Sequence, residues 1–288
     1  MKFITASMKR IQYCFLIIFL CVMGLGCSDL ESTNRNKKKT EHELILEYRI
    51  KSISEYQSLV HLDVPEKEKI HHVDQYDEKG NLQTATGYLN DGNVDFISTC
   101  TYDKDGNLLE KKSTKKGGFF ISRDLKSYDT KNRRNQNLHF EDPTDPFLYG
   151  NINAFDTLGR LIESYIFWPT GAQAIQSYTF NGMMMVVNEQ HAYNGGFQYR
   201  WAYKYDKNEN QIEAIQYDQD SVVRARSLFA YDRNNQLIEK TDYLEGSVAY
   251  HARYTYDAKF LMSTKTEYST FGRVSATYRY KYEYFDEQ

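Results

Sequence analysis

The stretch YDKDGNL at residues 102–108 decides the fold, because the chain repeats a version of it about every 26 residues. An aromatic residue and an aspartate lead into a Gly-Asn-Leu triplet or its variant after Tyr76, Tyr102, Phe155 and Tyr231. In this pattern the aspartate accepts an amide hydrogen bond within the turn, and the glycine adopts a positive φ. Such a turn is the usual three-residue connection of a β-hairpin. The motif therefore predicts antiparallel strands joined by tight turns.

The segments that flank the motif alternate aromatic with other residues, as in Tyr278, Tyr280, Tyr282 and Tyr284. Strict alternation is typical of a strand and places these rings on one face of a sheet. A second turn follows in each unit, for example at Glu245-Gly246. The repeat has eight units and a truncated last one at Phe285-Asp286; the eight begin at Tyr76, Tyr102, Tyr128, Phe155, Phe180, Tyr205, Tyr231 and Tyr256.

These patterns predict an all-β fold and no helix. We expect an antiparallel meander of about 16 strands, built from two-stranded repeats of about 26 residues. Open sheets beyond about ten strands curl or split, so we expect the sheet to be curled or rolled with its tyrosine-rich face inward.

The repeated Tyr-Asp-x-x-Gly-Asn-Leu units resemble the YD repeats of the Rhs (rearrangement hotspot) family. The resemblance covers about residues 70–288 and implies a β-sheet shell in an extracellular setting. In the family, such shells enclose a toxin. The sequence here ends at YKYEYFDEQ, with neither the autoprotease core nor the toxin tip. It is more similar to small bacterial lipoproteins made of such repeats alone.

Residues 1–26 have the pattern of a signal peptide, with Lys9-Arg10 before an apolar run at residues 11–23. That run is too short to be a stable membrane anchor. Met8 is an alternative start. The segment ends at Gly26-Cys27 and resembles a bacterial lipoprotein signal, although Gly24 stands where that family prefers leucine. The alternative is an ordinary secretory signal in which Cys27 has no role.

The cysteine pattern favours the lipoprotein, in which Cys27 is the lipidation site and carries palmitate-type chains. Cys14 and Cys21 leave with the signal, so Cys100 is the cysteine that remains and is predicted to be a small core residue. Residues 27–42 then form the lipidated cysteine and a flexible polar tether, and residues 43–288 form the repeat domain. The acidic start of the tether, residues 28–31, is similar to signals that send lipoproteins to the exterior of the bacterial outer membrane.

The charge excludes some partners. Without residues 1–26 the chain has 33 Lys and Arg against 39 Asp and Glu, a net charge of −6. Such a chain is a poor ligand for nucleic acid or for an anionic membrane surface.

The sequence contains no motif for a nucleophile, a phosphate loop or a dinucleotide, so we predict no catalytic residues and no cofactor. Asp103 and its neighbours resemble a calcium loop, but the glycine comes too early, and turn formation explains them. A cluster of His and Asp at His61, Asp63, His71, His72 and Asp74 is the candidate metal site. Because His71 and His72 are adjacent in a predicted strand, we expect them on opposite faces, and no metal is predicted.

One segment interrupts the repeats. Residues 139–150, HFEDPTDPFLYG, hold two of the four prolines, and Trp168 follows one unit later. Such insertions often lie on a binding face, and an exposed Trp168 would stack on sugars; a tolerated insertion and an edge-capping tryptophan are the alternatives.

The sequence therefore favours a lipid-anchored cell-envelope protein that acts as a non-catalytic binding or scaffold module. Its ligand would be a glycan or an envelope protein, bound at residues that the sequence does not identify. The alternatives are a carbohydrate- or peptidoglycan-directed enzyme with its site at the edge of the rolled sheet, and an orphan partner of an Rhs toxin system.

Overall fold

The computed structural model describes residues 39–61, 64–129, 134–144, 146–181 and 186–286. Strands make up most of the described chain, and one short helix precedes them. The elements are α2(Glu41–Glu47), β1(Ile50–His61), β2(Val64–Pro65), β3(Lys69–Tyr76), β4(Leu82–Tyr88), β5(Val94–Tyr102), β6(Leu108–Lys115), β7(Phe120–Asp129), β8(Arg134–Phe140), β9(Tyr149–Phe155), β10(Leu161–Phe167), β11(Gln173–Phe180), β12(Val186–Tyr193), β13(Gly196–Tyr205), β14(Gln211–Asp218), β15(Val223–Tyr231), β16(Leu237–Leu244), β17(Ser247–Tyr256), β18(Met262–Tyr268) and β19(Val274–Tyr284).

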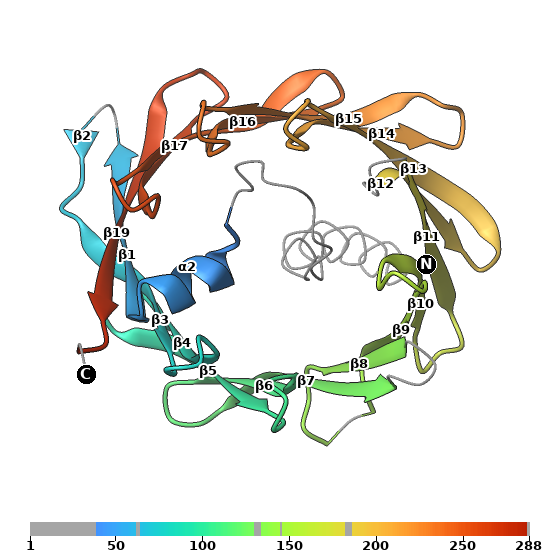
Figure 1. Cartoon of the computed structure of the whole chain (residues 1–288), viewed down its shortest axis with the longest axis horizontal. Helices are drawn as coiled ribbons and strands as arrows, with labels where there is room; N and C mark the ends of the chain where they lie inside the picture. The colour runs from blue at the N-terminus through green and yellow to red at the C-terminus, as the bar shows by residue number, and fades with distance from the viewer. Residues whose placement is uncertain (1–38, 62–63, 130–133, 145, 182–185, 287–288) are drawn as a thin grey trace, which may run out of the picture.

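The strands close into an antiparallel barrel (Figure 1). From β3 to β19 each strand pairs with its neighbours in sequence, and β1 pairs with both β3 and β19. The short strand β2 pairs with β1 alone, which leaves eighteen strands in the ring. The all-β, antiparallel prediction is confirmed. The curled or rolled meander of about 16 strands is in fact a closed barrel of eighteen.

The strand that closes the ring comes from the N-terminal side of the repeats. The hydroxyl of Tyr282 in β19 makes the same bond as the leading tyrosines, so the truncated last unit begins at Tyr282 and not at Phe285. Among the described residues, no strand follows β19. β1 takes the place of that missing strand, with Ile53 opposite Tyr282 and Glu55 opposite Tyr280. The sequence alone did not predict this closure, because the pairing joins residues more than 200 positions apart.

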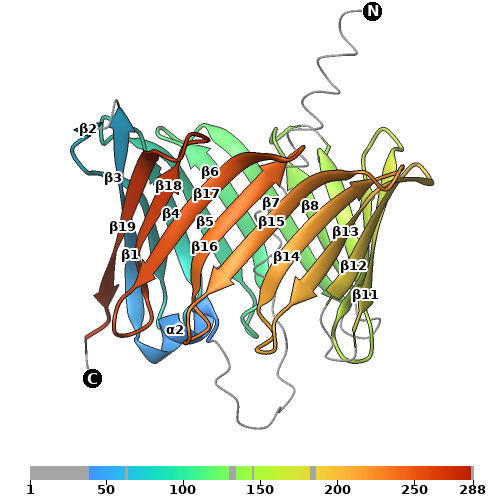
Figure 2. The ribbon, with the colours of Figure 1, turned by 90° about the horizontal axis from the view of Figure 1, so that it is seen from above.

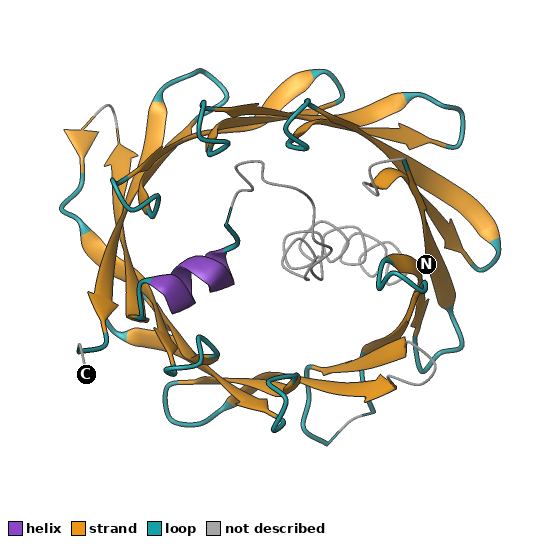
Figure 3. Cartoon of the chain, viewed as in Figure 1, coloured by secondary structure: helices purple, strands orange, loops and turns teal. Residues whose placement is uncertain are grey.

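The barrel has two distinct rims (Figure 2). The repeated aspartate turns and α2 lie at one rim, here called the α2 rim. The second turn of each unit and β2 lie at the other, the β2 rim. Figure 3 shows α2 inside the ring, where it contacts the wall at the α2 rim.

The aspartate turns have the predicted geometry. Asp103 Oδ1 accepts the amide N–H groups of Asp105 and Asn107 at 2.9 and 2.8 Å, and Gly106 has φ of +84°. Hydrogen bonds from Asn107 hold the pKa of Asp103 below its usual value. The same two amide bonds recur at Asp77, Asp156, Asp206, Asp232 and Asp257. Because this carboxylate serves the turn, the turn chemistry accounts for the residues that resembled a calcium loop.

The helix α2 was not predicted. Thr40 caps it in a capping box with Glu43, and Ile45 packs with Ile50 and Leu261 in the small hydrophobic core of the described chain. The tether predicted to run to residue 42 therefore overlaps a helix that begins at Glu41. The signal peptide, Cys27 and the rest of the tether lie outside the described residues.

Candidate ligand-binding lumen

The contacts of α2 show which face of the wall points inward. Ile53, Tyr76 and Tyr282 pack against the core that α2 forms inside the ring. Successive strand residues point to opposite faces. Residues an even number of positions from these three, and the residues paired opposite them, therefore line the lumen. Tyr76 and Tyr282 therefore face inward in this part of the wall, and the pairing registers show which residues of the neighbouring strands share their face.

A ladder of tyrosines lies at the α2 rim. The hydroxyl of Tyr102 donates to the carbonyl oxygen of Leu82 at 2.9 Å, and Tyr231 donates to Gln211 in the same way at 2.9 Å. Each bond joins a leading tyrosine to the start of the strand that follows the previous turn; Tyr128, Tyr205, Tyr256 and Tyr282 repeat it. Burial raises the pKa of Tyr205, Tyr231 and Tyr256 to about 12, so these phenols stay protonated and keep donating.

A polar surface of the lumen spans β17, β18, β19 and β1. We call it the lumen patch and define it by six residues: Glu55, Tyr250, Lys265, Glu267, Tyr278 and Tyr280. Tyr278 lies at its centre and is 9% exposed. Its hydroxyl lies 3.2 Å from Glu267 Oε2 and accepts from Gln57 Nε2 at 2.9 Å. The ammonium of Lys265 lies 4.6 Å from the centre of its ring.

The carboxylates of the lumen patch connect its tyrosines. Glu267 Oε1 accepts from Tyr250 at 3.1 Å and lies 2.6 Å from Lys265 Nζ. Glu55 Oε2 accepts from Tyr280 at 2.8 Å. Burial, followed by the carboxylate of Glu55, raises the pKa of Tyr280, so its phenol is a neutral donor. The patch is therefore an array of aromatic faces whose polar groups are held in fixed directions.

A second buried cluster lies on β12 and β13. Tyr203 donates to Glu189 Oε2 at 2.6 Å, and His191 stacks on Tyr199 with ring centres 4.2 Å apart. His191 Nε2 lies 2.6 Å from Glu189 Oε1, but the contact is poorly aligned for a hydrogen bond. Both Glu189 and His191 are 6% exposed. The cluster is a smaller network than the lumen patch, because one carboxylate is shared by a tyrosine and a histidine.

The structure corrects the interpretation of the His/Asp cluster. The pairing of β1 with β3 has a bulge between Glu55 and Tyr56, and His71 is the extra residue. His71 Nδ1 lies 2.7 Å from Glu55 Oε1, and His72 Nε2 lies 2.9 Å from Asp74 Oδ1. Glu55 and Asp74 both line the lumen, so the two histidines share a face, and the expected opposite faces are wrong. They have separate carboxylate partners, and the described residues hold no group of three metal-ligating side chains.

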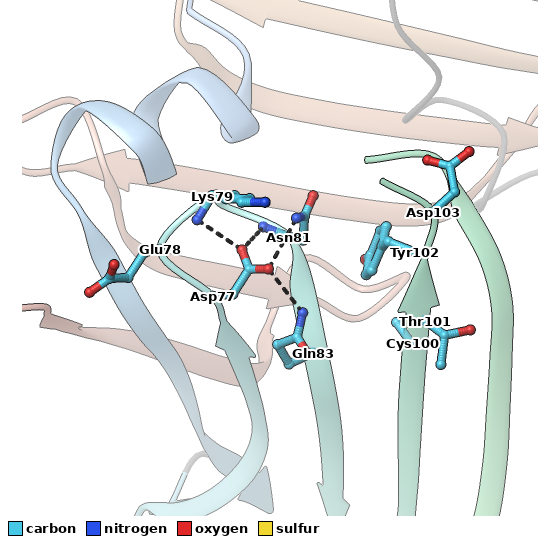
Figure 4. Close-up of a pocket in the computed structure, with 9 residues that line it drawn as sticks. All are labelled: Asp77, Glu78, Lys79, Asn81, Gln83, Cys100, Thr101, Tyr102 and Asp103. Carbon is cyan, nitrogen blue, oxygen red and sulfur yellow. Dashed lines mark hydrogen bonds between the residues drawn. The ribbon is translucent and has the colours of Figure 1, made fainter. Parts of the chain in front are cut away.

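A groove of about 480 Å³ lies between two neighbouring aspartate turns (Figure 4). Asp77, Gln83, Cys100 and Tyr102 are among its lining residues. Asp77 Oδ2 accepts from Gln83 Nε2 at 3.1 Å, so this carboxylate is committed to its own turn. Cys100 is 8% exposed, and burial raises the pKa of its thiol. A protonated thiol is a weak nucleophile, so Cys100 does not give this groove an activated thiolate.

The segment that interrupts the repeats lies at the β2 rim. His139 and Tyr149 stack with ring centres 4.9 Å apart at its two ends, and the Phe147 ring contacts that of Phe167. Trp168 lies in the next turn of the same rim, where its ring meets Tyr193 edge-on. Trp168 is half-buried, so it does not project as an isolated sugar-stacking ring.

The outer wall carries ion pairs. Glu213 lies 2.6 Å from both Lys204 and Arg226, and Glu110 lies 2.6 Å from Arg123. Hydrogen bonds from Lys204 and Arg226 hold the pKa of Glu213 below its usual value. Within the described part of the chain, no helix has the length and apolar character needed to cross a bilayer.

No family model matches the sequence, and no curated protein matches it. Among solved structures, a porin-like protein from Bacteroides uniformis is similar at 12% identity, with a TM-score of 0.45, over 82% of this chain and 97% of that one. A porin-like protein from Bacteroides vulgatus gives 10% identity and a TM-score of 0.35 over 66% and 95%. The Tc holotoxin pore of Photorhabdus luminescens gives 13% identity and a TM-score of 0.32 over 82% of this chain but only 17% of that one. With TM-scores below 0.5, these similarities assign neither a family nor a function.

Proposed function

We propose that the barrel is a non-catalytic binding module and that its lumen patch binds a neutral glycan. The supporting observation is the continuous network of Tyr250, Glu267, Tyr278 and Lys265 on three adjacent strands facing the lumen. Rigid tyrosine faces with fixed polar groups provide broad amphipathic contact at a low cost in conformational entropy.

The charges of the patch favour a neutral ligand. Lys265 is paired with Glu267 at 2.6 Å, and Lys240, on the neighbouring strand β16, is paired with Asp242 at 2.9 Å. Glu55 adds a further carboxylate. With its cations neutralised, the patch has no excess positive charge for an anion, while its carboxylates are strong acceptors for sugar hydroxyl groups.

The test begins with purified protein on a glycan array and continues with titration calorimetry of the best glycan. Tyr278→Phe removes the hydroxyl that links Gln57 to Glu267, and Lys265→Met removes the cation over the ring. We expect each to weaken binding by roughly tenfold, the value of one hydrogen bond to a charged group. Tyr268→Phe on the outer wall is the matched control and should bind like the natural protein.

Array binding that survives both lumen substitutions would show that the site lies elsewhere. Turnover of an array glycan would contradict the non-catalytic part and favour the alternative, an enzyme directed at carbohydrate or peptidoglycan.

The proposal places this module on the bacterial outer membrane as a small lipoprotein related to the Rhs YD-repeat family. The support is the sequence pattern at Gly26-Cys27, the charged tether and the repeated Tyr-Asp turns. Under this proposal Cys27 holds the protein on the membrane, and the barrel presents its lumen to ligands of the envelope.

A further inference from the structure

Large apolar side chains are exposed all around the β2 rim. Phe271 is 90% exposed and Phe119 is 72% exposed, each at the tip of a turn that contains glycine. Among the described residues, eight of the nine connections of this rim carry one such side chain: Val64, Leu89, Phe119, Leu148, Phe197, Val222, Leu244 and Phe271. Trp168, half-buried, lies in the ninth. We call these nine side chains the apolar crown.

The opposite rim differs. The described aspartate turns of the α2 rim are made mainly of Asp, Lys, Asn and Gly. The exposed apolar side chains at this rim are each less than half exposed: Leu46, Leu109, Leu158, Ile162, Ile212, Ile238 and Phe260. The described apolar side chains that are more than half exposed all lie at the β2 rim: Val64, Phe119, Leu244 and Phe271. The enrichment at the β2 rim is therefore a property of one end of the barrel. Large apolar groups concentrated at one end mark an interaction surface, because single surface apolar residues would otherwise be scattered.

We infer that the apolar crown docks the β2 rim on the surface of a zwitterionic lipid bilayer. Neighbouring turns of this rim are two strands apart, roughly 10 Å, and they follow the closed ring of strands (Figure 1). The crown is thus a ring of separate tips. A stable protein interface needs a continuous patch of about 800 Å² on each partner, which separate tips do not provide. Each tip can insert into a bilayer independently, and one flat bilayer surface contacts all the tips of the ring.

The charges near the crown favour zwitterionic over anionic lipid headgroups. Arg224 lies 2.6 Å from Asp218 and 3.6 Å from Glu245 of the neighbouring turn, so it is neutralised within the protein. Lys116, close to Phe119, donates to Asn93 of the adjacent turn. Without an excess of free cations, the rim has no strong attraction to anionic lipid, and apolar insertion is the driving force.

The predicted tether is long enough for this orientation. Thirteen residues from Cys27 to Thr40 reach at most about 45 Å, while a strand of ten residues spans about 33 Å. A lipid on Cys27 can therefore share a membrane with the β2 rim although α2 lies at the other rim. The inference does not depend on the lipid or on the lumen patch as a ligand site.

The test measures which rim enters the acyl region. Two variants of the full chain carry Trp168→Phe, and Trp201 remains as an internal reference in the lumen wall. One adds Phe271→Trp at the β2 rim, and the other adds Leu158→Trp at the α2 rim. Each is combined with phosphatidylcholine vesicles brominated in their acyl chains. We expect several-fold quenching of the tryptophan at position 271 and none at position 158, because docking tips enter the headgroup and acyl boundary.

A second arm uses natural Trp168 as the reporter. The triple variant Phe119→Ser, Leu244→Ser, Phe271→Ser should lose the bromolipid quenching of Trp168. The control Ile162→Ser, Ile212→Ser, Ile238→Ser removes three apolar side chains, each 36–40% exposed, from the wall near the α2 rim and should retain it. Equal quenching at positions 271 and 158, or none at either, would overturn the inference. A second copy of the chain would also overturn the inference if it covers the crown. Light scattering without vesicles would then show a doubled mass, and the tryptophan at position 271 would be protected from quenching by acrylamide.

Discussion

The hydroxyl of Tyr102 donates a hydrogen bond to the carbonyl oxygen of Leu82, twenty residues earlier in the chain and 2.9 Å away. The leading tyrosine of one unit is thereby bound to the first strand residue after the turn of the previous unit. Since the same bond recurs around the α2 rim, each tyrosine fixes the register of one unit against the next. This relationship explains why the aromatic residue before each aspartate is most often tyrosine.

The first prediction concerns this ladder. Tyr231→Phe removes the bond to Gln211 and should lower the free energy of unfolding by about 1 kcal/mol, the usual net value of a hydrogen bond. Thermal melting and urea titration would measure the loss. Tyr268→Phe is the control, because its hydroxyl makes no hydrogen bond to the described residues. Equal effects of the two substitutions would mean that the ladder adds nothing beyond ring packing.

The second prediction concerns the turn glycine. Gly106 has φ of +84°, and a Cβ at this position would meet no atom within 4 Å. Gly106→Val should therefore cost roughly 1–2 kcal/mol from backbone strain alone. Gly106→Asn is the control, since Asn235 occupies the equivalent position at φ of +63°. Hydrogen exchange across residues 95–115 should show local opening before global unfolding, and unchanged exchange together with an unchanged melting curve would refute this assignment of the turn.

Local patterns predicted most of the barrel wall. The Asp-x-x-Gly turns, the alternation at Tyr278 and Tyr280 and the inward tyrosine face each depend on short-range chemistry, and the structure has all three. Closure was not predictable in this way, because β1 pairs with β19 through contacts far apart in sequence. The helix has a local sequence signal, the capping box of Thr40 and Glu43, which the prediction of no helix did not take into account.

The lumen patch shows why the candidate site was harder to predict. Glu55 belongs to β1, Glu267 to β18 and Tyr278 to β19, and only the closed ring brings them to one surface. His71 and His72 were assigned to opposite faces because regular alternation was assumed, and a single bulge reverses that assignment. Bulges carry no reliable signal in one sequence.

The third prediction concerns pH. Asp124 raises the pKa of His139, and Asp74 raises the pKa of His72. A histidine whose pKa is higher in the folded state contributes stability that is fully present below about pH 6.5 and is lost as pH rises through the folded value. The free energy of unfolding should therefore decline as pH rises above about 6.5. His139→Gln should flatten part of that decline in urea titrations at several pH values. An unchanged slope would show that the His139–Asp124 contact does not stabilise the charged form.

The fourth prediction concerns closure of the ring. Ser54 lies opposite Lys281 in the register of β1 and β19. Opposite residues in an antiparallel pair lie within the Cα range of a disulfide, about 4.4–6.8 Å. Ser54→Cys with Lys281→Cys should form a cross-link under mild oxidation, which peptide mapping by mass spectrometry would detect. Ser54→Cys with Arg279→Cys is the control, offset by two residues, and should not. Cross-linking in the control alone would show a shifted register.

The fifth prediction concerns Cys27, which lies outside the described residues. Residues 11–23 form an apolar run that ends close to Gly26-Cys27, and a charged segment follows, as in a lipoprotein. Several acyl chains, at about 0.8 kcal/mol per buried methylene, hold a protein on a bilayer. Cys27→Ser should therefore abolish incorporation of radiolabelled palmitate and leave an uncleaved precursor or a soluble exported domain. Triton X-114 partitioning of both proteins is the second measurement. If the natural protein takes up no label and stays in the aqueous phase, the departure from leucine at Gly24 has inactivated the lipoprotein signal, and the protein is secreted without an anchor.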